Sequence, residues 1–480
     1  MHATEVAEDT LKIHSNLDRE RWIKKSFAYY SDILKVLKFL IPSGARVLEV
    51  GCSTGWLLRK IENASHRVGV ERDPLLVDFA RSQGTSEDFH WGNFERSDFS
   101  LNQKFDFIIA SDVVPFAYDI QLLFENCFRH LEPGNEGRVF VSCYNPYLKP
   151  IYKLAEHLGL KSPSKPENWV TERDIFNLAE LAGFEVVRKG YRGLLPWNFL
   201  GLGRIINRWL APLPIFKFFN LYFYALLRPR KVDQKNLRQL KSVSVVVPAR
   251  NEAGNIRAAR DRLPRLADRV ELIYVEGNSK DNTWDTIQKV ASEPHPDWMD
   301  IKVYKQMGRG KANAVHLGFA KSSGDVLVIL DADLTVPPED LPRFVEPLRS
   351  GIADFTHGDR LTYPMEGQAM QFLNMIANKF FGLSFTFVLG QDFKDTLCGT
   401  KVLWRSDWEK ILALRSYFGD FDPFGDFELL FGSIKLNHKM VQIPIHYKAR
   451  TYGETNIQRW HHGWILLKML GFASPRMKFF

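Results

Sequence analysis

The sequence predicts two successive α/β domains, each a doubly wound sheet with helices on both faces. Three observations predict this. At 480 residues the chain is too long for one ordinary domain. In the first half, a short apolar strand runs into the glycine-rich turn Glu49-x-Gly51-x-x-x-Gly55 and then into a helix. In the second half, the apolar run 326–330 stops at Asp331 and Asp333, as a buried strand does when its carboxyl end carries a site.

The composition is that of a globular protein that favours anionic partners. Hydrophobic residues make up 45% and charged residues 25% of the chain. A net charge of +8 favours phosphates or lipid headgroups and does not require nucleic acid, so we expect no nucleic-acid partner. The four cysteines are too scattered for a zinc site or a disulfide framework. The first residues lack the features of a signal peptide, and we expect a cytoplasmic protein.

The first domain begins with a helical segment and then alternates strands with helices. Its glycine turn lets the backbone approach a ligand closely, and the helix that follows offers free N–H groups. The next strand ends at Glu71, 22 residues after Glu49. A carboxylate at that place can accept both hydroxyls of a ribose. One helical face is predicted over residues 1–40 from the spacing of Ile33, Val36, Leu37 and Leu40.

Two further strands, at 105–112 and 138–142, continue this pattern. Over about residues 30–190 the sequence resembles the class I S-adenosylmethionine-dependent methyltransferases. The resemblance implies a Rossmann-like fold with S-adenosylmethionine as the cofactor. It also implies cofactor-binding residues: Glu49, Gly51 and Gly55 around the methionine part, Glu71 at the ribose, Asn93 and Phe94 beside the adenine, and Asp112 facing the reactive centre.

The first domain departs from that family at two places. Asn93 stands where many relatives have aspartate. Val114-Pro115-Phe116 replaces the acidic–histidine pair that is common after the fourth strand, so the sequence gives no evident catalytic base. A domain that keeps the fold without turnover remains the alternative.

Residues 193–241 are expected to form a connector between a domain at 1–192 and a domain at 242–480. Arg204, Arg208 and Lys217 interrupt its apolar residues, so no stretch reaches the ~18 apolar residues that a membrane span needs. Aromatic residues mixed with basic ones are typical of a segment at a membrane surface. Packing between the two domains is the alternative. The polar run from Arg228 to about Lys241 is predicted to be a linker.

Four segments follow one another in the second domain. They are a strand at 242–248, a strand at 270–275, a loop entering a helix at 308–318, and the strand that ends in Asp331 and Asp333. In this order, over about residues 242–455, they resemble the family 2 glycosyltransferases of the GT-A type. The resemblance implies a nucleotide-sugar donor and inversion at the anomeric carbon.

The resemblance also assigns roles on the donor side. Two carboxylates offer the hard oxygen ligands that Mg²⁺ or Mn²⁺ prefers, and the metal neutralises the departing diphosphate. Glu276-Gly277 replaces the usual pair of aspartates in the second motif. The residues implied are Pro248, Arg250, Glu252 and Glu276 at the base, Gly310 and Lys311 at the diphosphate, and Asp331 and Asp333 at the metal, with Asp333 counted as catalytic.

The acceptor side is similar to the polyprenyl-phosphate (dolichyl-phosphate) glucosyl- and mannosyltransferase branch. In that branch two arginines hold the acceptor phosphate, which corresponds to Arg360 and Arg450 in this sequence. A phosphate acceptor needs no strong general base. If the acceptor were a sugar hydroxyl, Asp426 or Glu428 would have to remove its proton.

Phenylalanines gather at 372–390, and aromatic and apolar residues at 460–471, which suggests a membrane surface; an ordinary core helix is the alternative for the first segment. The adjacent His461 and His462 are interpreted as surface residues. We therefore expect a bifunctional transferase, peripheral at the cytosolic membrane face, that moves a hexose to a polyprenyl phosphate or other lipid-linked acceptor and a methyl group to an unknown acceptor. The alternative is a glycosyltransferase that acts on a sugar hydroxyl in polysaccharide synthesis, with a non-catalytic methyltransferase-like domain.

Overall fold

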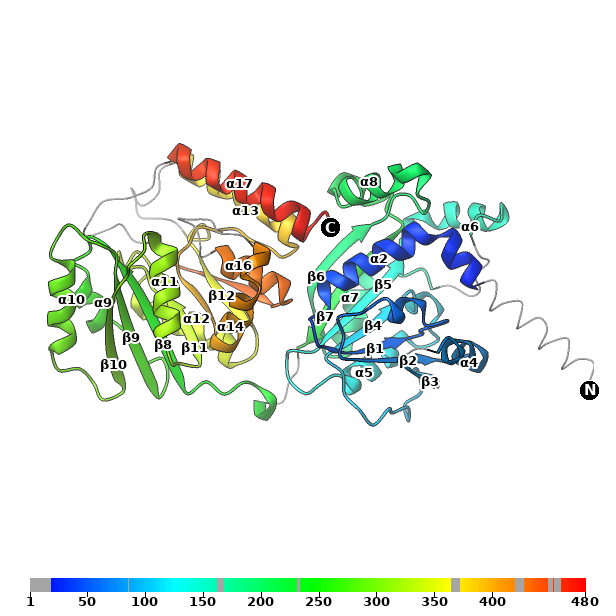
Figure 1. Cartoon of the computed structure of the whole chain (residues 1–480), viewed down its shortest axis with the longest axis horizontal. Coiled ribbons are helices and arrows are strands. Elements are labelled where there is room, and N and C mark those ends of the chain that lie inside the picture. The colour runs from blue at the N-terminus through cyan, green and yellow to red at the C-terminus, as the bar shows by residue number, and fades with distance from the viewer. Residues whose placement is uncertain are drawn as a thin grey trace, which may run out of the picture. The chain divides into compact units, whose positions relative to one another are not determined.

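The computed structural model describes residues 19–84, 86–161, 168–230, 234–363, 372–418, 427–447, 452 and 459–480. The chain divides into two compact units (Figure 1). Unit 1 comprises Met1–Asn236 together with Phe479–Phe480, and unit 2 comprises Leu237–Lys478. Each unit is built on its own sheet with helices packed against it, which confirms the prediction of two α/β domains.

The unit 1 sheet has the strand order β3-β2-β1-β4-β5-β7-β6. The first five strands pair in parallel, and β7 runs antiparallel between β5 and β6. From β1 the chain moves outward to β3 and returns on the other side at β4, so the strand order reverses between β1 and β4. Ligands of open α/β sheets bind at the carboxyl ends of the strands at such a point. The strands are β1 (Arg46–Val50), β2 (His66–Glu71), β3 (Asp88–Trp91), β4 (Phe107–Ser111), β5 (Arg138–Tyr144), β6 (Phe184–Arg192) and β7 (Tyr222–Pro229).

Helices cover this sheet and bury the apolar faces of its parallel strands. The predicted face of the first helix is confirmed, because its four spaced apolar residues are all buried. Side-chain caps start several helices; Asp73, for example, accepts from Leu75 N. The helices are α2 (Phe27–Leu40), α3 (Trp56–Arg59), α4 (Pro74–Ser82), α5 (Ile120–His130), α6 (Lys149–His157), α7 (Glu172–Leu181) and α8 (Leu202–Trp209).

Strand β7 corrects the expected connector at 193–241. Residues 222–229 are wholly buried within the first sheet, and unit 1 continues to Asn236 instead of ending at 192. Tyr222 of β7 and Arg192 of β6 both donate to the buried carboxylate of Asp32 on α2, at 2.9 to 3.0 Å. The uninterrupted apolar run there is therefore an interior strand of the sheet.

The unit 2 sheet has the order β10-β9-β8-β11-β13-β12-β14. Strands β10, β9, β8 and β11 pair in parallel, and β13 is antiparallel to both β11 and β12. The order reverses between β8 and β11, which places a second crevice at the carboxyl ends of these two strands. The strands are β8 (Ser242–Ala249), β9 (Arg269–Glu276), β10 (Met299–Lys305), β11 (Val326–Ile329), β12 (Phe355–Asp359), β13 (Lys401–Trp404) and β14 (Met440–Pro444).

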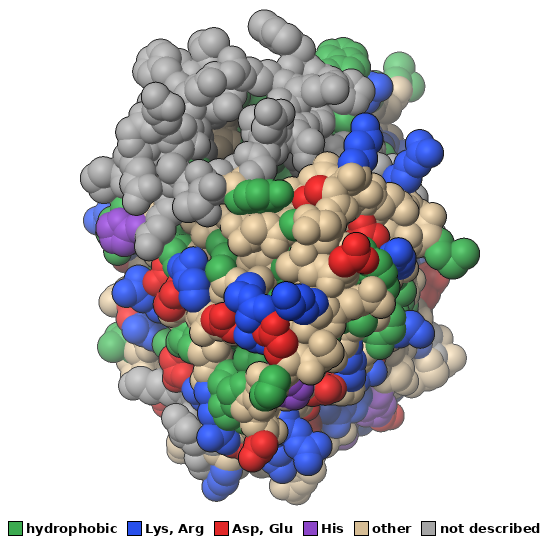
Figure 2. Space-filling model, turned by 90° about the vertical axis from the view of Figure 1, so that its left-hand side faces the viewer, with side chains coloured by type: hydrophobic (Ala, Val, Ile, Leu, Met, Phe, Trp, Pro, Cys, Tyr) green, Lys and Arg blue, Asp and Glu red, His purple; other side chains and the backbone are tan. Residues whose placement is uncertain are grey.

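Two long helices, α13 (Phe372–Leu389) and α17 (Arg459–Met477), pack against each other in unit 2 (Figure 1). Among the described residues, no helix has both the length and the apolar character to cross a membrane. On the face of unit 2 seen in Figure 2, basic and acidic side chains are interspersed. The other helices are α9 (Ile256–Asp261), α10 (Thr283–Ser292), α11 (Gly310–Lys321), α12 (Leu341–Arg349), α14 (Arg405–Ala413), α15 (Arg415–Phe418) and α16 (Phe427–Lys435).

Candidate functional site

Unit 1 contains a cavity of about 750 Å³ at the carboxyl ends of β1, β2 and β4. This volume lies in the range of pockets that bind small molecules, ~300–1,000 Å³. Six of the seven residues that the sequence assigned to the cofactor line it: Glu49, Gly51, Glu71, Asn93, Phe94 and Asp112. The fold thus brings together residues that lie up to 63 positions apart in the chain.

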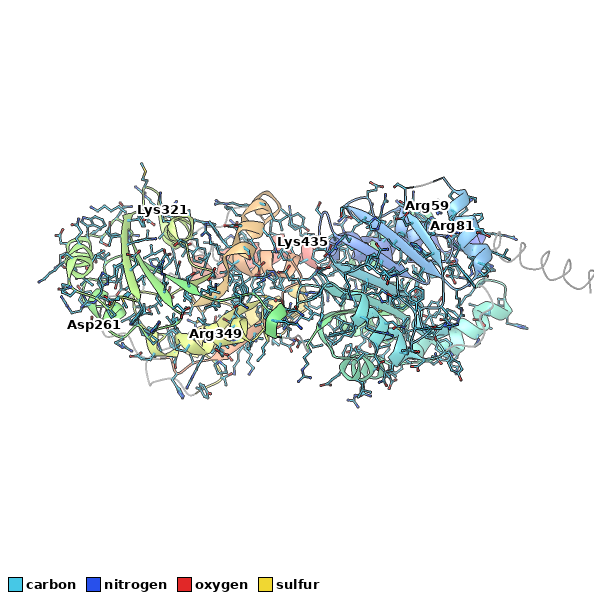
Figure 3. The ribbon with its side chains drawn as sticks, turned by 90° about the horizontal axis from the view of Figure 1, so that it is seen from below. Arg59, Arg81, Asp261, Lys321, Arg349 and Lys435 are labelled. Carbon is cyan, nitrogen blue, oxygen red and sulfur yellow. The ribbon has the colours of Figure 1, made fainter. Side chains whose placement is uncertain are left out.

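The turn after β1 requires glycine at two positions. Gly51 has φ +67°, and a Cβ there would lie 2.7 Å from Val113 Cγ2. Gly55 has φ +74°, and a Cβ there would lie 2.5 Å from the ring of Phe89. Gly55 does not line the cavity, so its contribution is to shape the turn. The labelled Arg59 (Figure 3) closes the turn by donating to Thr54 O at 2.8 Å.

Glu71 is anchored by the backbone at the end of β2. Its carboxylate accepts from Ser53 N at 2.9 Å, Arg72 N at 2.8 Å and Asp73 N at 3.2 Å. Three donors fix the orientation of this carboxylate beside the glycine turn. Its role at a ribose stays a prediction, and the geometry provides a rigid acceptor for it.

Glu49 is buried in β1 with an incompletely satisfied carboxylate. Burial, together with the nearby charge of Glu71, raises the pKa of Glu49 to about 8, against the lowering effect of a backbone hydrogen bond from Leu58 and the charge of Arg59. Its Oε2 has no hydrogen-bond partner among the described residues. A buried carboxylate of this kind suits a cationic ligand group, such as the ammonium of a bound amino acid moiety.

Asn93 and Phe94 line the same cavity in different ways. Asn93 is exposed, and its Oδ1 accepts from Glu95 N at 3.0 Å. Phe94 is buried and its ring lies 5.3 Å from that of Phe99 and 5.1 Å from that of His130. The ring of Phe94 is therefore part of the hydrophobic core as well as the cavity wall.

Asp112 follows β4 in a left-handed backbone conformation with φ +55°. Tyr29 Oη donates to both of its carboxylate oxygens, at 3.0 and 2.8 Å, and Ser142 Oγ donates at 3.3 Å. Burial raises the pKa of Asp112 to about 6, although these two hydroxyls and Lys161 oppose the rise. A carboxylate with a pKa near neutrality is a suitable proton acceptor, which the sequence alone did not reveal.

The sequence analysis also missed the aromatic wall of this cavity. The ring of Tyr29 lies 5.3 Å from that of Tyr222, and the ring of Tyr144 lies 5.7 Å from that of Tyr152. The only sequence signal was the Tyr29-Tyr30 pair on the first helix. The aromatic side chains that line the cavity are Trp22, Tyr29, Tyr30, Trp56, Tyr144, Tyr152, Trp197 and Phe219, besides Phe94 and Phe116.

The candidate donor site of unit 2 lies where β11 ends. Lys311 Nζ, near the start of α11, lies 2.5 Å from Asp331 Oδ1. Gly399 packs against both, since a Cβ there would lie 2.0 Å from Asp331 Oδ2 and 2.3 Å from Lys311 Nζ. The carboxylate of Asp331 is therefore paired with the ammonium group of Lys311. The closeness of Gly399 to Asp331 could not be read from the sequence.

An extended strand continued through Asp331-Ala332-Asp333 would point both carboxylates to one face, but the strand stops short of them. β11 ends at Ile329, and Asp331 to Leu334 form a turn in which Leu334 N donates to Asp331 O at 3.1 Å. The alternation of an extended strand therefore does not orient Asp331 and Asp333. Asp333 Oδ1 instead accepts from Thr335 N at 3.1 Å and Thr335 Oγ1 at 2.9 Å.

These carboxylates fit a divalent cation as Mg²⁺ usually binds, through one or two carboxylates with substrate phosphates and water. Among the described residues there is no cluster of three or more metal-ligating side chains. Gly310 has φ +85° and begins α11, whose N-cap Arg309 makes no side-chain cap bond. The first N–H groups of this helix therefore suit a diphosphate.

Local polar contacts shape the turns that follow β8 and β9, near the predicted base site. Pro248 and Glu276 belong to these paired strands, and Glu276 Oε1 accepts from Ser279 N at 2.5 Å. Glu252 is buried, and its Oε2 accepts from Asn255 Nδ2 at 2.7 Å. Arg250 is exposed, with its Cβ 3.2 Å from the position of a Cβ on Gly277.

Of the two candidate bases, Glu428 lies among the described residues. It is buried at the start of α16, with Oε2 3.1 Å from Nε2 of His316 on α11. Its Oε1 has no hydrogen-bond partner among the described residues. Asp426 lies outside the described residues.

Arg360, predicted to contact an acceptor phosphate, is already paired with a carboxylate. Its Nε and Nη2 donate to Asp395, at 2.5 and 2.8 Å, and both side chains are buried. The guanidinium also lies over the ring of Tyr447, 5.2 Å from its centroid. A phosphate would have to share Arg360 with Asp395. Arg450, the second predicted arginine, lies outside the described residues.

Comparison with known families gives one match in each unit. Residues 22–189 match the methyltransferase domain model Methyltransf_23, and residues 244–412 match the model of glycosyl transferase family 2. The two matches fall on either side of the boundary between the compact units.

Curated relatives match part of the chain. A dolichol-phosphate mannosyltransferase of Pyrococcus furiosus is 28% identical over 222 residues, which cover 45% of this chain and 59% of the relative. An undecaprenyl-phosphate 4-deoxy-4-formamido-L-arabinose transferase of Yersinia pestis is 30% identical over 151 residues, which cover 30% of this chain and 46% of the relative. The chain thus spans about half the length of these relatives.

Solved structures are also similar to parts of the chain. A SAM-dependent methyltransferase of Thermotoga maritima is 19% identical with a TM-score of 0.34, covering 45% of this chain and 95% of that one. The glucosyl-3-phosphoglycerate synthase of Mycobacterium tuberculosis is 20% identical with a TM-score of 0.35, covering 49% and 80%. From the family matches, the chain carries a methyltransferase domain followed by a family 2 glycosyltransferase domain.

Proposed function

We propose that the chain is a bifunctional transferase whose second unit moves a hexose from a nucleotide-sugar to a polyprenyl phosphate or other lipid-linked acceptor. The observation that carries this proposal is the cluster of Asp331, Lys311 and Gly399 at the switch point of the family 2 domain. Two curated relatives are named a dolichol-phosphate mannosyltransferase and an undecaprenyl-phosphate 4-deoxy-4-formamido-L-arabinose transferase. These names favour a polyprenyl phosphate as the acceptor.

Each residue of the donor site has a physical task in this proposal. Asp331 and Asp333 would hold Mg²⁺ or Mn²⁺, which neutralises charge on a departing diphosphate. Lys311 supplies a second positive charge beside Asp331, and the start of α11 offers backbone donors to phosphate. Pro248, Arg250, Glu252 and Glu276 surround the ends of β8 and β9, where the base would lie.

We place this reaction at a membrane surface. The neighbouring helices α13 and α17 expose four large apolar side chains: Phe380, Leu383, Trp464 and Leu467. Exposed aromatic and aliphatic side chains on neighbouring helices are typical of an interfacial surface. A lipid-linked acceptor would be reached from there.

The test is sugar transfer by the purified full chain with polyprenyl phosphate in detergent. We expect a glycolipid product with Mg²⁺ or Mn²⁺, no product after chelation, and none from Asp333→Ala. Asp285→Ala, which removes an exposed aspartate on α10, is the matched control and should retain activity. Hydrolysis of the donor without any glycolipid would contradict the acceptor assignment.

A second candidate acceptor is a sugar hydroxyl, and one observation favours it. The buried Glu428 contacts His316, and its Oε1 has no hydrogen-bond partner in the described part of the chain, an arrangement that can accept a proton. Under this alternative Glu428→Gln abolishes transfer to an oligosaccharide, whereas transfer to a phosphate acceptor does not require the carboxylate.

We propose that the first unit transfers methyl from S-adenosylmethionine. When bound, this cofactor supplies a methyl group on a positively charged sulfur. Glu49 would pair with its ammonium group, Glu71 would accept from its ribose, and Asp112 would take the proton of the acceptor. Cofactor binding measured by calorimetry, with Glu71→Ala as the variant that abolishes it, tests this half.

A further inference from the structure

Helix α8 of unit 1 turns its apolar side outward. Leu202, Ile205 and Trp209 are 55%, 59% and 44% exposed, whereas Gly203 and Asn207 are buried. A helix on the surface of a protein in water normally shows the opposite arrangement, with apolar residues toward the core. Exposed apolar residues gathered on one helix face mark an interaction surface.

Polar contacts on the inner side of α8 hold it in this orientation. Asn207 Oδ1 accepts from Leu194 N at 2.8 Å and Leu195 N at 2.9 Å, and its Nδ2 donates to Leu195 O at 2.7 Å. At Gly203 a Cβ would lie only 2.1 Å from Trp197 O, so the helix touches the preceding loop. Rotating the apolar face inward would break these contacts.

The loop held by α8 lines the unit 1 cavity. Leu194, Leu195 and Trp197 belong to its wall. Three other apolar residues line the cavity and are also exposed at the surface: Ile151 (57%), Leu160 (39%) and Phe219 (62%). An apolar path therefore runs from the outside to the cavity that contains Asp112. We call the exposed residues Ile151, Leu160, Leu202, Ile205, Trp209 and Phe219 the mouth surface.

Charge on and around the mouth surface is positive. Residues 194–219 contain Arg204, Arg208 and Lys217 and no acidic residue. Arg204 is exposed, and α6 adds the exposed Lys149 and Lys153. Lys153 pairs with Glu156 on the same helix, and Lys217 pairs with Glu172. Apolar side chains among basic ones suit a bilayer that carries anionic headgroups.

We propose that the mouth surface binds an anionic lipid bilayer and that the methyl acceptor of unit 1 is carried by a lipid in that bilayer. The acceptor class rests on the methyltransferase function proposed above. An amphiphile matches the cavity, because its chain can leave along the apolar path while its polar end reaches Asp112. A water-soluble acceptor would not need an apolar path to the exterior.

The transfer step balances with groups already named. An oxygen or nitrogen of the lipid headgroup forms a bond to the methyl carbon, and the carbon–sulfur bond breaks with its electron pair going to sulfur. The proton lost by the acceptor goes to the carboxylate of Asp112, which Tyr29 and Ser142 hold in place. No further reactant is required.

The docking test is co-sedimentation of the full chain with vesicles of phosphatidylcholine alone or with about one third phosphatidylglycerol. We expect binding only to the anionic vesicles. Ile205→Ser should weaken it roughly tenfold or more, since the apolar side chain no longer enters the lipid. Arg204→Glu should also weaken it, and added salt should do the same.

Leu181→Ser is the matched control, because Leu181 on α7 is 59% exposed and lies outside the mouth surface. It should bind as the unchanged protein does. Equal losses in Leu181→Ser and Ile205→Ser, or no binding of the unchanged protein to anionic vesicles, would overturn the docking surface.

The acceptor class is tested by adding S-adenosylmethionine with a labelled methyl group to the vesicles. Label in the extracted lipid, reduced in Ile205→Ser, is the expected result. Label that enters only water-soluble acceptors overturns the lipid acceptor while leaving the methyltransferase function in place. Vesicle binding without any cofactor binding would instead overturn the methyltransferase function and leave the docking surface standing.

Discussion

Replacing Glu49 with glutamine should stabilise unit 1 at neutral and alkaline pH. Burial raises the pKa of Glu49 from 4.5 to about 8 in the folded chain. Between these two values the folded unit keeps a proton that the unfolded chain has released, so the stability of the unit falls as the pH rises. Glutamine keeps the shape of the side chain and cannot ionise, which removes this loss.

The magnitude follows from the two pKa values. They differ by roughly 3.5 pH units, and at about 1.36 kcal/mol per unit this corresponds to on the order of 5 kcal/mol at about pH 8. For a unit of this size, 1 kcal/mol shifts the unfolding temperature by ~2–4 °C, so Glu49→Gln should unfold on the order of 10 °C higher at that pH. Near pH 4.5 the variant and the unchanged protein should be nearly equal.

The assay is calorimetric unfolding of the full chain at about pH 5 and about pH 8. S-adenosylhomocysteine identifies the transition of unit 1, because a ligand raises the unfolding temperature of the unit that binds it. The exposed Glu62 supplies the control: Glu62→Gln should leave the difference between the two pH values unchanged. If Glu49→Gln and the unchanged protein differ equally at both pH values, Glu49 is not neutral in the fold and the reasoning fails.

Three other changes have defined outcomes. Tyr29→Phe removes the hydroxyl that lowers the pKa of Asp112. The acidic limb of the pH profile of the methyl transfer rate should therefore move upward from about pH 6, by about one pH unit. Asp395→Asn leaves the buried Arg360 without its partner and should lower the stability of unit 2 by roughly 3–5 kcal/mol in chemical unfolding. Gly399→Ala puts a methyl group against Asp331 and should abolish sugar transfer, measured as glycolipid formation, without unfolding the unit.

Each of these changes has a control in the chain. Tyr30→Phe alters the neighbouring tyrosine; the hydroxyls that hydrogen-bond to Asp112 are those of Tyr29 and Ser142, so this variant should leave the pH profile in place. Glu339→Gln breaks an exposed pair with Arg262 and should cost at most about 1 kcal/mol. Gly463→Ala adds a methyl group where there is open space, so it should not affect transfer. If a control variant changed the measured property as much as the variant it is paired with, the corresponding prediction would be contradicted.

Local patterns in the sequence predicted the elements that stand on either side of each site. The glycine turn after β1 and the acid ending β2 are short-range signals, and the structure brings Glu49, Gly51 and Glu71 to one cavity. The strand before Asp331 was equally clear from its continuous apolar run. Such signals suffice when the site lies at the ends of adjacent parallel strands.

What the sequence did not reveal depends on contacts between distant residues or on a single turn. Gly399 lies against Asp331, 68 positions earlier in the chain, and Arg360 pairs with Asp395 across 35 positions. The turn at Asp331 to Leu334 overrode the alternation expected of an extended strand. The apolar run that forms β7 was ambiguous, because periodicity does not separate a buried strand from an interfacial segment.

The position of β7 between β5 and β6 also governs how unit 1 is made on the ribosome. β6 (Phe184–Arg192) is synthesised before β7 (Tyr222–Pro229), yet β7 is its only neighbour in the sheet as described. Until residues 193–229 have emerged, β5 presents an unpaired edge and β6 has no strand to join, a state prone to aggregation. Expression of unit 1 alone therefore needs a chain that extends through Asn236, and a cut at residue 192 would leave the nascent sheet permanently open.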